Sequence, residues 1–320
     1  MRILTGIQPS GQLHIGNYFG AMRPAIELQD RGDTYLFIAN YHALTSQPDA
    51  ADLRSRIRGV AVDWLACGLD PTKATFYRQT DVPAVTELAW ILFNHTPVGL
   101  LERATSYKDK IANGLPANTG LFTYPILQAA DILICRADRV PVGQDQRQHI
   151  EITRDVAIRF NNRYGDILTI PEGQIRTDVA VVPGLDGRKM SKSYDNTIPI
   201  FGPEKALRKI IMKVVTDSTP MEEPKNPDTC NVYALYKLFA DDTQLADMRA
   251  HYEGGNYGYG HAKQALFEAF WEYFRPMRTR RDELLADPAE VDRILDDGGR
   301  RARETADPIM ADIRQAVGLA

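Results

Sequence analysis

The N-terminal quarter of the chain alternates short apolar runs with a stretch of helical spacing, and this alternation limits the fold most strongly. The apolar runs stand at residues 3–4, 34–39 and 74–79. Between the last two, apolar side chains recur at helical spacing from residue 53 to residue 65, and Gly68 follows where a helix end favours glycine. Strands that alternate with helices form a parallel sheet with helices on its faces. The sequence therefore predicts an α/β fold built on a parallel sheet.

The same pattern continues toward the middle of the chain, with one interruption. Residues 80–96 and 124–133 predict helices, and the run at residues 139–142 predicts a further strand. Residues 97–119 are polar and lack a clear period, which predicts a connecting insertion. The apolar run at residues 179–182 predicts the last strand of the sheet.

From residue 194 onward the pattern changes to helices alone. Pro203 suits the first position of a helix, and apolar residues then recur on one side of it. We therefore expect two domains, one at residues 1–193 with the insertion around residues 97–119, and a smaller helical one at residues 194–320. Within the second domain, the final helices at residues 289–320 are the candidates for packing back on the first domain.

The charge and cysteine content argue against several classes of protein. The formal net charge is −4, so a nucleic-acid partner would need a local basic face, and arginine clusters at residues 275–281 and 300–303 fit either phosphate contacts or a solvated helix face. The three cysteines are far apart and include no C-x-x-C pair, which argues against a zinc site and suits a reducing cytoplasm. No run of about 18 apolar residues occurs, so neither secretion nor a membrane span is expected.

The loop after the first strand is a candidate anion site. In the stretch GIQPSGQLHIGNYFGA, residues 6–21, Pro9 and Gly11 end the strand and His14 begins a helix. A strand, a glycine-bearing loop and a helix N-terminus present backbone N–H groups to a phosphate, and His14 can donate a further hydrogen bond. The spacing fits neither of the two common phosphate loops. Taken alone, the stretch also fits an ordinary turn between a strand and a helix.

A second cationic loop follows the last predicted strand. After a tight turn at Asp186 and Gly187, residues 189–193 read Lys-Met-Ser-Lys-Ser. Taken alone, such a loop is usually solvated surface.

Three polar residues stand where a parallel sheet would place a site. His42 follows the strand at residues 34–39, and the carboxyl ends of parallel strands carry ligands. Asp131 lies in an apolar helix, where a carboxylate needs a partner, which can be a structural group such as Arg136 or a donor on a ligand. Asp145 suits a ribose hydroxyl or a helix N-cap.

The two loops together resemble a known pair of motifs. His14-Ile15-Gly16-Asn17 is similar to the HIGH signature of class I aminoacyl-tRNA synthetases, with Asn17 in place of the last histidine, and residues 189–193 match the KMSKS signature in the expected order. The stretches GIQPSGQLHIGNY, TYPILQAADIL and VPVGQDQRQH are most similar to the tryptophanyl-tRNA synthetase family. The resemblance covers essentially the whole chain. It implies a Rossmann-like parallel sheet with HIGH-type and KMSKS motifs, and a smaller C-terminal α-helical domain on the anticodon side.

The resemblance also implies a reaction. The carboxylate of L-tryptophan attacks the α-phosphate of ATP, pyrophosphate leaves, and the 2′-hydroxyl of the terminal adenosine of tRNA(Trp) then attacks the adenylate. Mg²⁺ would accompany the nucleotide, without a metal site of the protein's own. A cytoplasmic homodimer without a membrane partner is implied as well.

The site residues are carried over position by position. The implied catalytic residues are His14, Asn17, Lys189 and Lys192. The implied ATP-binding residues are Gln8, Pro9, Ser10, Gly16, Asn17, Gly143, Gln144, Asp145, Val182, Lys189, Met190, Ser191, Lys192 and Ser193. The implied tryptophan-binding residues are Asp131, Tyr124, Gln128, Gln146 and His42. Among them, Asp131 would accept a hydrogen bond from the indole N–H, and Tyr124 and Gln146 would hold the ammonium group.

Several departures keep alternatives open. Many family members have methionine at the position of Gln128 and glutamate at that of Gln144. Tyr124, Gln128 and Asp131 also match the Y-x-x-x-Q-x-x-D pattern of tyrosyl-tRNA synthetases, which makes tyrosine–tRNA ligase the main rival. Leu4 argues against it, because the tyrosyl family has a tyrosine there. A small-molecule adenylyltransferase does not call for KMSKS, and a non-catalytic binding module does not call for the lysines of that loop.

Overall fold

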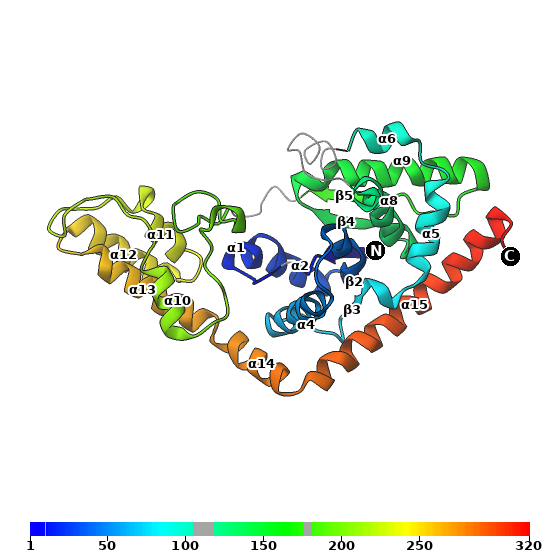
Figure 1. Cartoon of the computed structure of the whole chain (residues 1–320). Coiled ribbons are helices and arrows are strands. Elements are labelled where there is room, and N and C mark those ends of the chain that lie inside the picture. Colours follow the sequence, from blue (N-terminus) through cyan, green and yellow to red (C-terminus); the bar gives the residue numbers. More distant parts are fainter. Residues whose placement is uncertain (10, 105–117, 176–180) are drawn as a thin grey trace. The chain divides into compact units, whose positions relative to one another are not determined.

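A parallel sheet organises the larger part of the chain (Figure 1). The computed structural model describes residues 1–9, 11–104, 118–175 and 181–320, and within these the sheet has five strands in the order β3-β2-β1-β4-β5. All neighbouring strands pair in parallel. The strands are β1 (Arg2–Ile7), β2 (Asp33–Ile38), β3 (Ala74–Arg78), β4 (Arg139–Val142) and β5 (Glu172–Ile175). The predicted α/β class and the first four predicted strands are confirmed.

The prediction of the last strand is wrong. The edge strand is β5, with the sequence EGQI, whereas residues 181–182 are not in a strand and residues 179–180 lie outside the described residues. An edge strand leaves one side unpaired and tolerates polar residues, so β5 lacks the apolar run that marks a buried strand. Of the apolar run that misled the prediction, Val181 is 71% exposed and Val182 is buried.

Helices cover the sheet much as the periodicity indicates. They include α3 (Asn40–Ala43), α4 (Ala50–Ala66), α5 (Ala84–Phe93), α6 (Val98–Glu102), α8 (Thr119–Ile134) and α9 (Arg147–Tyr164). Helix α5 begins later than the predicted residue 80 because a 3₁₀ turn, Gln79–Asp81, follows β3 directly. The expected insertion holds α6 and then residues 105–117, which lie outside the described residues. Helix α8 packs against both α5 and α9 and supplies much of the buried core.

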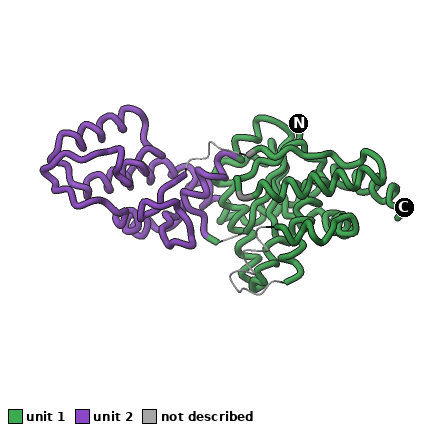
Figure 2. Tube along the Cα trace, turned by 90° about the horizontal axis from the view of Figure 1, so that it is seen from above, with its two compact units in different colours: residues 1–11, 25–178, 284–320 green, residues 12–24, 179–283 purple. Residues whose placement is uncertain are grey.

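The chain divides by its contacts into two compact units (Figure 2). Unit 1 contains Met1–Gly11, Ala25–Asp178 and Leu284–Ala320, and unit 2 contains Gln12–Pro24 and Val179–Glu283. The sheet belongs to unit 1. The domain boundary expected at residue 193 remains a proposal about the organisation of the chain.

The last helix, α15 (Pro288–Val317), packs on the edge strand β3 within unit 1. Gly298 permits this approach, because a Cβ atom there would lie 1.8 Å from the Phe76 carbonyl oxygen. Arg301 donates to the carbonyls of Pro71 and Ala74 at 2.7 and 3.0 Å. Arg301 therefore contacts the backbone of its own unit, which does not support its interpretation as a phosphate contact.

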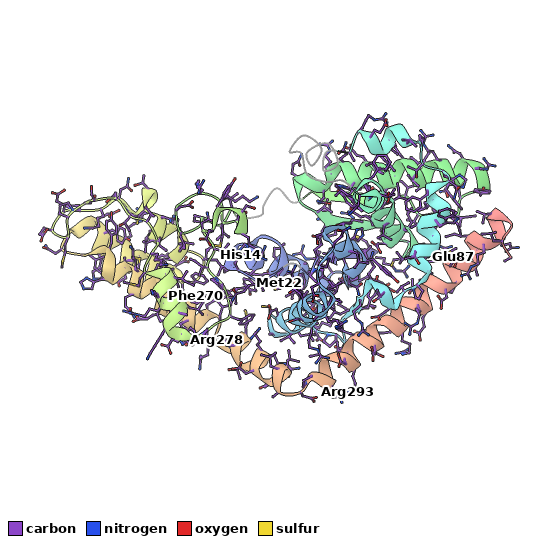
Figure 3. The ribbon with its side chains drawn as sticks, in the orientation of Figure 1. His14, Met22, Glu87, Phe270, Arg278 and Arg293 are labelled. Atoms are coloured by element: carbon purple, nitrogen blue, oxygen red, sulfur yellow. The ribbon has the colours of Figure 1, made fainter. Side chains whose placement is uncertain are left out.

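Unit 2 is helical around an aromatic core. Its elements include α1 (Ile15–Asn17), a π-helical turn (Tyr18–Met22), α10 (Glu204–Ile211), α11 (Asn231–Tyr236), α12 (Asp242–Gly254) and α13 (Tyr259–Tyr273), followed by α14 (Arg275–Ala286). Phe270, labelled in Figure 3, packs edge-on against Phe239 with ring centres 5.7 Å apart. Pro203 is the N-cap of α10 rather than its first residue, because its backbone is extended. Among the described helices of either unit, none is both long and apolar enough to cross a membrane.

Candidate active site

The HIGH-like motif forms a closed cap at the start of α1. His14 is the N-cap residue and is only 5% exposed. Its Nδ1 accepts a hydrogen bond from the Asn17 backbone N–H at 3.3 Å, and the Asn17 Oδ1 accepts from the His14 backbone N–H at 3.4 Å. Since Nδ1 is an acceptor, the proton of a neutral ring stands on Nε2. The cap therefore orients His14, which Figure 3 labels, as a hydrogen-bond donor through Nε2.

The environment keeps this imidazole neutral. Burial, with a smaller contribution from the positive charge of Lys192, lowers the pKa of His14 from 6.5 to about 4. A neutral donor next to a lysine suits an anionic ligand, because the lysine supplies the charge and the histidine supplies a directed N–H.

The KMSKS loop lies against the HIGH-like motif within unit 2. The segment after the loop pairs with the segment before α1: Ile15 N donates to the Ile198 carbonyl at 3.0 Å, and Ile200 N donates to the Leu13 carbonyl at 3.2 Å. A Cβ atom on Gly16 would lie 3.2 Å from the Met190 Cβ, so the absence of a side chain allows Met190 to pack there. Two motifs far apart in the sequence therefore meet in one unit.

A buried asparagine fixes the conformation of the KMSKS loop. Asn196 is 2% exposed, its Oδ1 accepts from the Ser191 N–H at 2.8 Å, and its Nδ2 donates to the Lys189 carbonyl at 3.2 Å and to Asp186 at 2.7 Å. The Val182 carbonyl accepts from the Met190 N–H at 2.9 Å. Asn196 was not predicted as a site residue. Its position three residues after the motif is the only signal that the sequence offers.

A second polar cluster lies in unit 1, around Asp131. This carboxylate on α8 is 3% exposed. Its Oδ2 lies 2.9 Å from His42 Nε2, and its Oδ1 and Oδ2 accept from Gln79 Nε2 at 2.8 and 2.9 Å. Burial raises the pKa of Asp131, and the hydrogen bonds from His42 and Gln79 oppose that rise. Arg136 is not the partner, because it pairs with Asp312 on α15.

Aromatic and imidazole rings extend this cluster. The Tyr124 hydroxyl lies 2.5 Å from His149 Nε2, and the Tyr124 ring meets the His42 ring edge-on with centres 6.1 Å apart. Gln128 and Gln146 are both half-buried. Sequence reasoning missed Gln79, although it directly follows the carboxyl end of β3, where a parallel sheet carries its site. It also missed His149, which lies in the first turn of α9.

The other predicted residues fall at strand ends or in the KMSKS loop. Gln8 and Pro9 follow β1, and Gly143 and Gln144 follow β4. Ser10 and the side chain of Asp145 lie outside what the structure describes. Lys192 and Ser193 occupy a short 3₁₀ helix, Lys192–Tyr194. The structure thus groups His14, Asn17, Val182 and residues 189–193 in unit 2, and the candidate tryptophan-binding residues in unit 1.

A cavity of about 390 Å³ also reaches Tyr124 within unit 1. Its lining is mostly apolar and comes from α5, α8 and the segment after β2. Asp131 is not among its lining residues. Among the described residues, no group of three or more His, Cys, Asp or Glu side chains could hold a metal ion.

Comparisons with known proteins agree with the resemblance of the two motifs to class I synthetases. The model of the family described as tRNA synthetases class I (W and Y) matches residues 1–275. The tryptophan–tRNA ligase of Fusobacterium nucleatum is 51% identical over 319 residues, covering 99% of this chain and 98% of that protein. The crystal structure of tryptophanyl-tRNA synthetase from Campylobacter jejuni, complexed with ADP and tryptophan, matches with a TM-score of 0.97 at 50% identity over 100% of both chains. Tyrosyl-tRNA synthetase from Archaeoglobus fulgidus shares the fold at 19% identity, with a TM-score of 0.65 over 88% of this chain and 90% of that chain.

Proposed function

Since the chain belongs to the class I tRNA synthetases for tryptophan and tyrosine, we propose that it is a tryptophan–tRNA ligase that uses ATP to join L-tryptophan to tRNA(Trp). The observation that carries this proposal is the match along the full chain, at about half identity, to enzymes of that name. Leu4 supports tryptophan over tyrosine. It is 1% exposed and apolar, and has no hydroxyl partner to offer a phenol.

The first step joins the carboxylate of tryptophan to the α-phosphorus of ATP, while the bond to the leaving pyrophosphate breaks. In the second step, the 2′-hydroxyl of the terminal adenosine of the tRNA attacks the acyl carbon, loses its proton, and releases AMP. The first nucleophile is already ionised and needs no general base. Catalysis of this step is then a matter of positioning and of stabilising charge on the phosphates.

The residues of unit 2 suit that task. Neutral His14 would donate from Nε2 to a phosphate oxygen, with Asn17 beside it, while Lys189 and Lys192 would stabilise the departing pyrophosphate. The missing side chain of Gly16 lets Met190 of the KMSKS loop pack beside His14, which keeps the two motifs together. Val182 would contact the adenine through its backbone. Mg²⁺, which the family resemblance implies, would be held mainly by the phosphates of the nucleotide and would neutralise part of their charge.

The residues of unit 1 suit an indole. Asp131 offers a buried carboxylate to the indole N–H, and Tyr124 and Gln146 would bind the ammonium group. A buried site that hydrogen-bonds a substrate N–H can reject analogues lacking it by about 10⁴–10⁵. Gln128, which replaces the usual methionine, would add a polar contact near that group.

We further propose a cytoplasmic homodimer. All three cysteines are buried thiols, which suits a reducing compartment. Unit 1 exposes large apolar side chains on or near α5 and α6, namely Trp90 at 68% and Val98 at 61%. Sedimentation equilibrium of the wild-type chain and of Trp90→Glu tests this proposal, since the substitution should shift a dimer toward monomer. A monomeric wild type would contradict it.

Pyrophosphate exchange tests the reaction and the substrate together. Exchange of labelled pyrophosphate into ATP should require tryptophan, and each of the other amino acids in turn should fail to support it. Charging of purified tRNA(Trp) with labelled tryptophan then tests the second step. Exchange with tyrosine but not tryptophan would contradict the substrate, and no exchange with any amino acid would favour a different adenylyltransferase or a binding module.

A further inference from the structure

The turn that follows β3 carries a glutamine that joins two elements around Asp131. Gln79 is 1% exposed. Its Nε2 donates to both Asp131 oxygens, and its Oε1 accepts from the backbone N–H groups of Tyr41 and His42 at 3.0 and 3.4 Å. The two backbone donors fix the orientation of the amide, because only its oxygen can accept from them. Gln79 therefore holds α8 and α3 in register through one buried side chain.

This arrangement leaves Asp131 with capacity for a ligand. An ionised carboxylate offers about four acceptor positions. Gln79 occupies two of them and His42 a third, all at 2.8–2.9 Å. The remaining position can accept one further donor, whose direction depends on where Gln79 and His42 hold the carboxylate.

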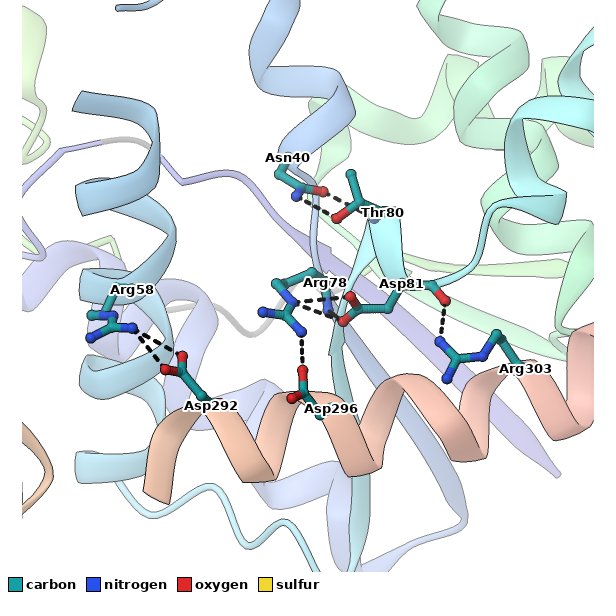
Figure 4. A network of polar contacts seen from close by, with 8 residues as sticks. All are labelled: Asn40, Arg58, Arg78, Thr80, Asp81, Asp292, Asp296 and Arg303. Carbon is teal, nitrogen blue, oxygen red and sulfur yellow. Dashed lines mark hydrogen bonds and ion pairs between the residues drawn. The ribbon is translucent and has the colours of Figure 1, made fainter. Parts of the chain in front are cut away.

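Helix α15 holds the turn that carries Gln79 (Figure 4). Asp81 closes the turn by accepting from the Arg78 backbone N–H at 2.9 Å and from the Arg78 guanidinium. From α15, Asp296 pairs with Arg78, and Arg303 donates to the Asp81 carbonyl at 2.6 Å. On the other side, Asn40 and Thr80 exchange two hydrogen bonds, which ties the turn to α3.

We propose that Gln79 is a positioning residue for recognition of the indole N–H, and that Asp296 and Arg303 of α15 hold the turn on which it stands. The inference rests on the proposed function, in which Asp131 accepts that N–H. It assigns to the last helix, about 200 residues away in sequence, a part in substrate discrimination.

The test compares tryptophan with its benzothiophene analogue, in which sulfur replaces the indole N–H. For each variant, kcat/KM in pyrophosphate exchange is measured with both substrates, and their ratio reports recognition of the N–H alone. Gln79→Met should lower this ratio at least about tenfold, since a mispositioned carboxylate loses a charge-assisted hydrogen bond. The KM for ATP should stay within about twofold, because uniform ATP binding is untouched. A ratio equal to that of the wild type would overturn the proposal.

Gln79→Asn gives a second test if Gln79→Met does not fold, since it keeps the amide but is one methylene too short to reach Asp131 and the Tyr41 and His42 backbone N–H groups together. It should lower the same ratio, and an unchanged ratio would again overturn the proposal. If the wild-type enzyme itself fails to activate tryptophan, the proposed function fails, which is a distinct result.

Two arginine substitutions on α15, one at the turn and one on the surface, test whether this helix positions Gln79. Arg303→Met should lower the ratio, whereas Arg300→Met should not, because the Arg300 side chain is 55% exposed and pairs with Asp297 and Glu304 on its own helix. Equal effects of the two substitutions would show that α15 has only a general structural role.

Discussion

Replacement of Asp131 by asparagine tests how the buried carboxylate recognises tryptophan. The substitution keeps the shape of the side chain but removes its charge and one acceptor oxygen. A hydrogen bond to a charged group contributes about 1.5–3 kcal/mol, so loss of the bond to the indole N–H should lower kcat/KM for tryptophan by about 10- to 150-fold. The Gln79 amide, which donates to both Asp131 oxygens, would also lose a partner. One buried polar group left unpaired should lower the free energy of unfolding by about 1–3 kcal/mol.

Pyrophosphate exchange measures the first effect and urea unfolding the second. Tryptophan and ATP are varied in turn, and Asp312→Asn serves as the control because Asp312 is an exposed carboxylate that pairs with Arg136. The KM for ATP should change by less than about twofold in both variants, since neither removes a contact to the nucleotide. Equal losses for tryptophan and ATP, or a change in kcat/KM for tryptophan no larger than in Asp312→Asn, would refute the assigned role.

The buried Asp131 carboxylate should make both the stability of the fold and the activation of tryptophan depend on pH. Burial raises the pKa of Asp131 above 3.8, so the group gains a proton at a higher pH in the folded protein than in the unfolded chain. Its ionised form therefore disfavours folding, and this cost grows as the pH rises from 3.8 through the raised pKa. Indole binding by contrast needs the ionised form, so kcat/KM for tryptophan should fall on the acid side in the wild type, and Asp131→Asn should remove that dependence.

Three further predictions address the phosphate side and the fold. In single-turnover measurements, Lys192→Ala should lower kcat of adenylate formation by about 10²–10³, the scale of one transition-state donor. The control Lys205→Ala, at an exposed lysine, should leave kcat unchanged. An effect of Lys192→Ala on substrate KM alone would contradict stabilisation of the transition state by Lys192. Because the pKa of His14 falls from 6.5 to about 4 on folding, its contribution to stability is complete above pH 6.5 and is lost as the pH falls toward 4. In urea unfolding, the difference in free energy of unfolding between wild type and His14→Asn should therefore shrink from pH 6.5 to pH 4. A constant difference over that range would contradict the buried, neutral state of His14. Gly298→Ala should lower the free energy of unfolding by about 1–3 kcal/mol, because the new Cβ would clash with the backbone of β3. Gly59→Ala, with nothing within 4 Å of the new Cβ, should not lower it. Equal results for the two variants would contradict the close packing of α15 on β3.

The sequence predicts the first four strands well because each carries a short apolar run, which is largely buried in β2 and β3 and partly buried in β1 and β4. It misses β5, a short and mainly polar edge strand, because only its pairing with β4 marks it as a strand. It also leaves the role of Arg301 open, since spacing along a helix does not reveal that this guanidinium donates to the Pro71 and Ala74 carbonyls at the start of β3. Such interactions depend on which elements become neighbours.

In the candidate site too, some features can be predicted from the sequence and others depend on the fold. Both signature motifs can be recognised in the sequence, but the contact between Gly16 and Met190 comes only from the fold. Asp131 stands out because a carboxylate is costly in an apolar helix. Of its two partners, His42 stands out because it follows a buried strand, whereas Gln79 does not, because nothing in the sequence indicates that the turn after β3 meets α8. The assignment of Arg136 as a possible partner shows how nearness in sequence misleads.

The proposed reaction requires the HIGH-like and KMSKS motifs to act on one triphosphate. A crystal structure of the enzyme with tryptophan and a non-hydrolysable ATP analogue would show whether they do. We expect phosphate oxygens within hydrogen-bond distance of both His14 Nε2 and the Lys192 ammonium group. Phosphates bound away from these two side chains would contradict it.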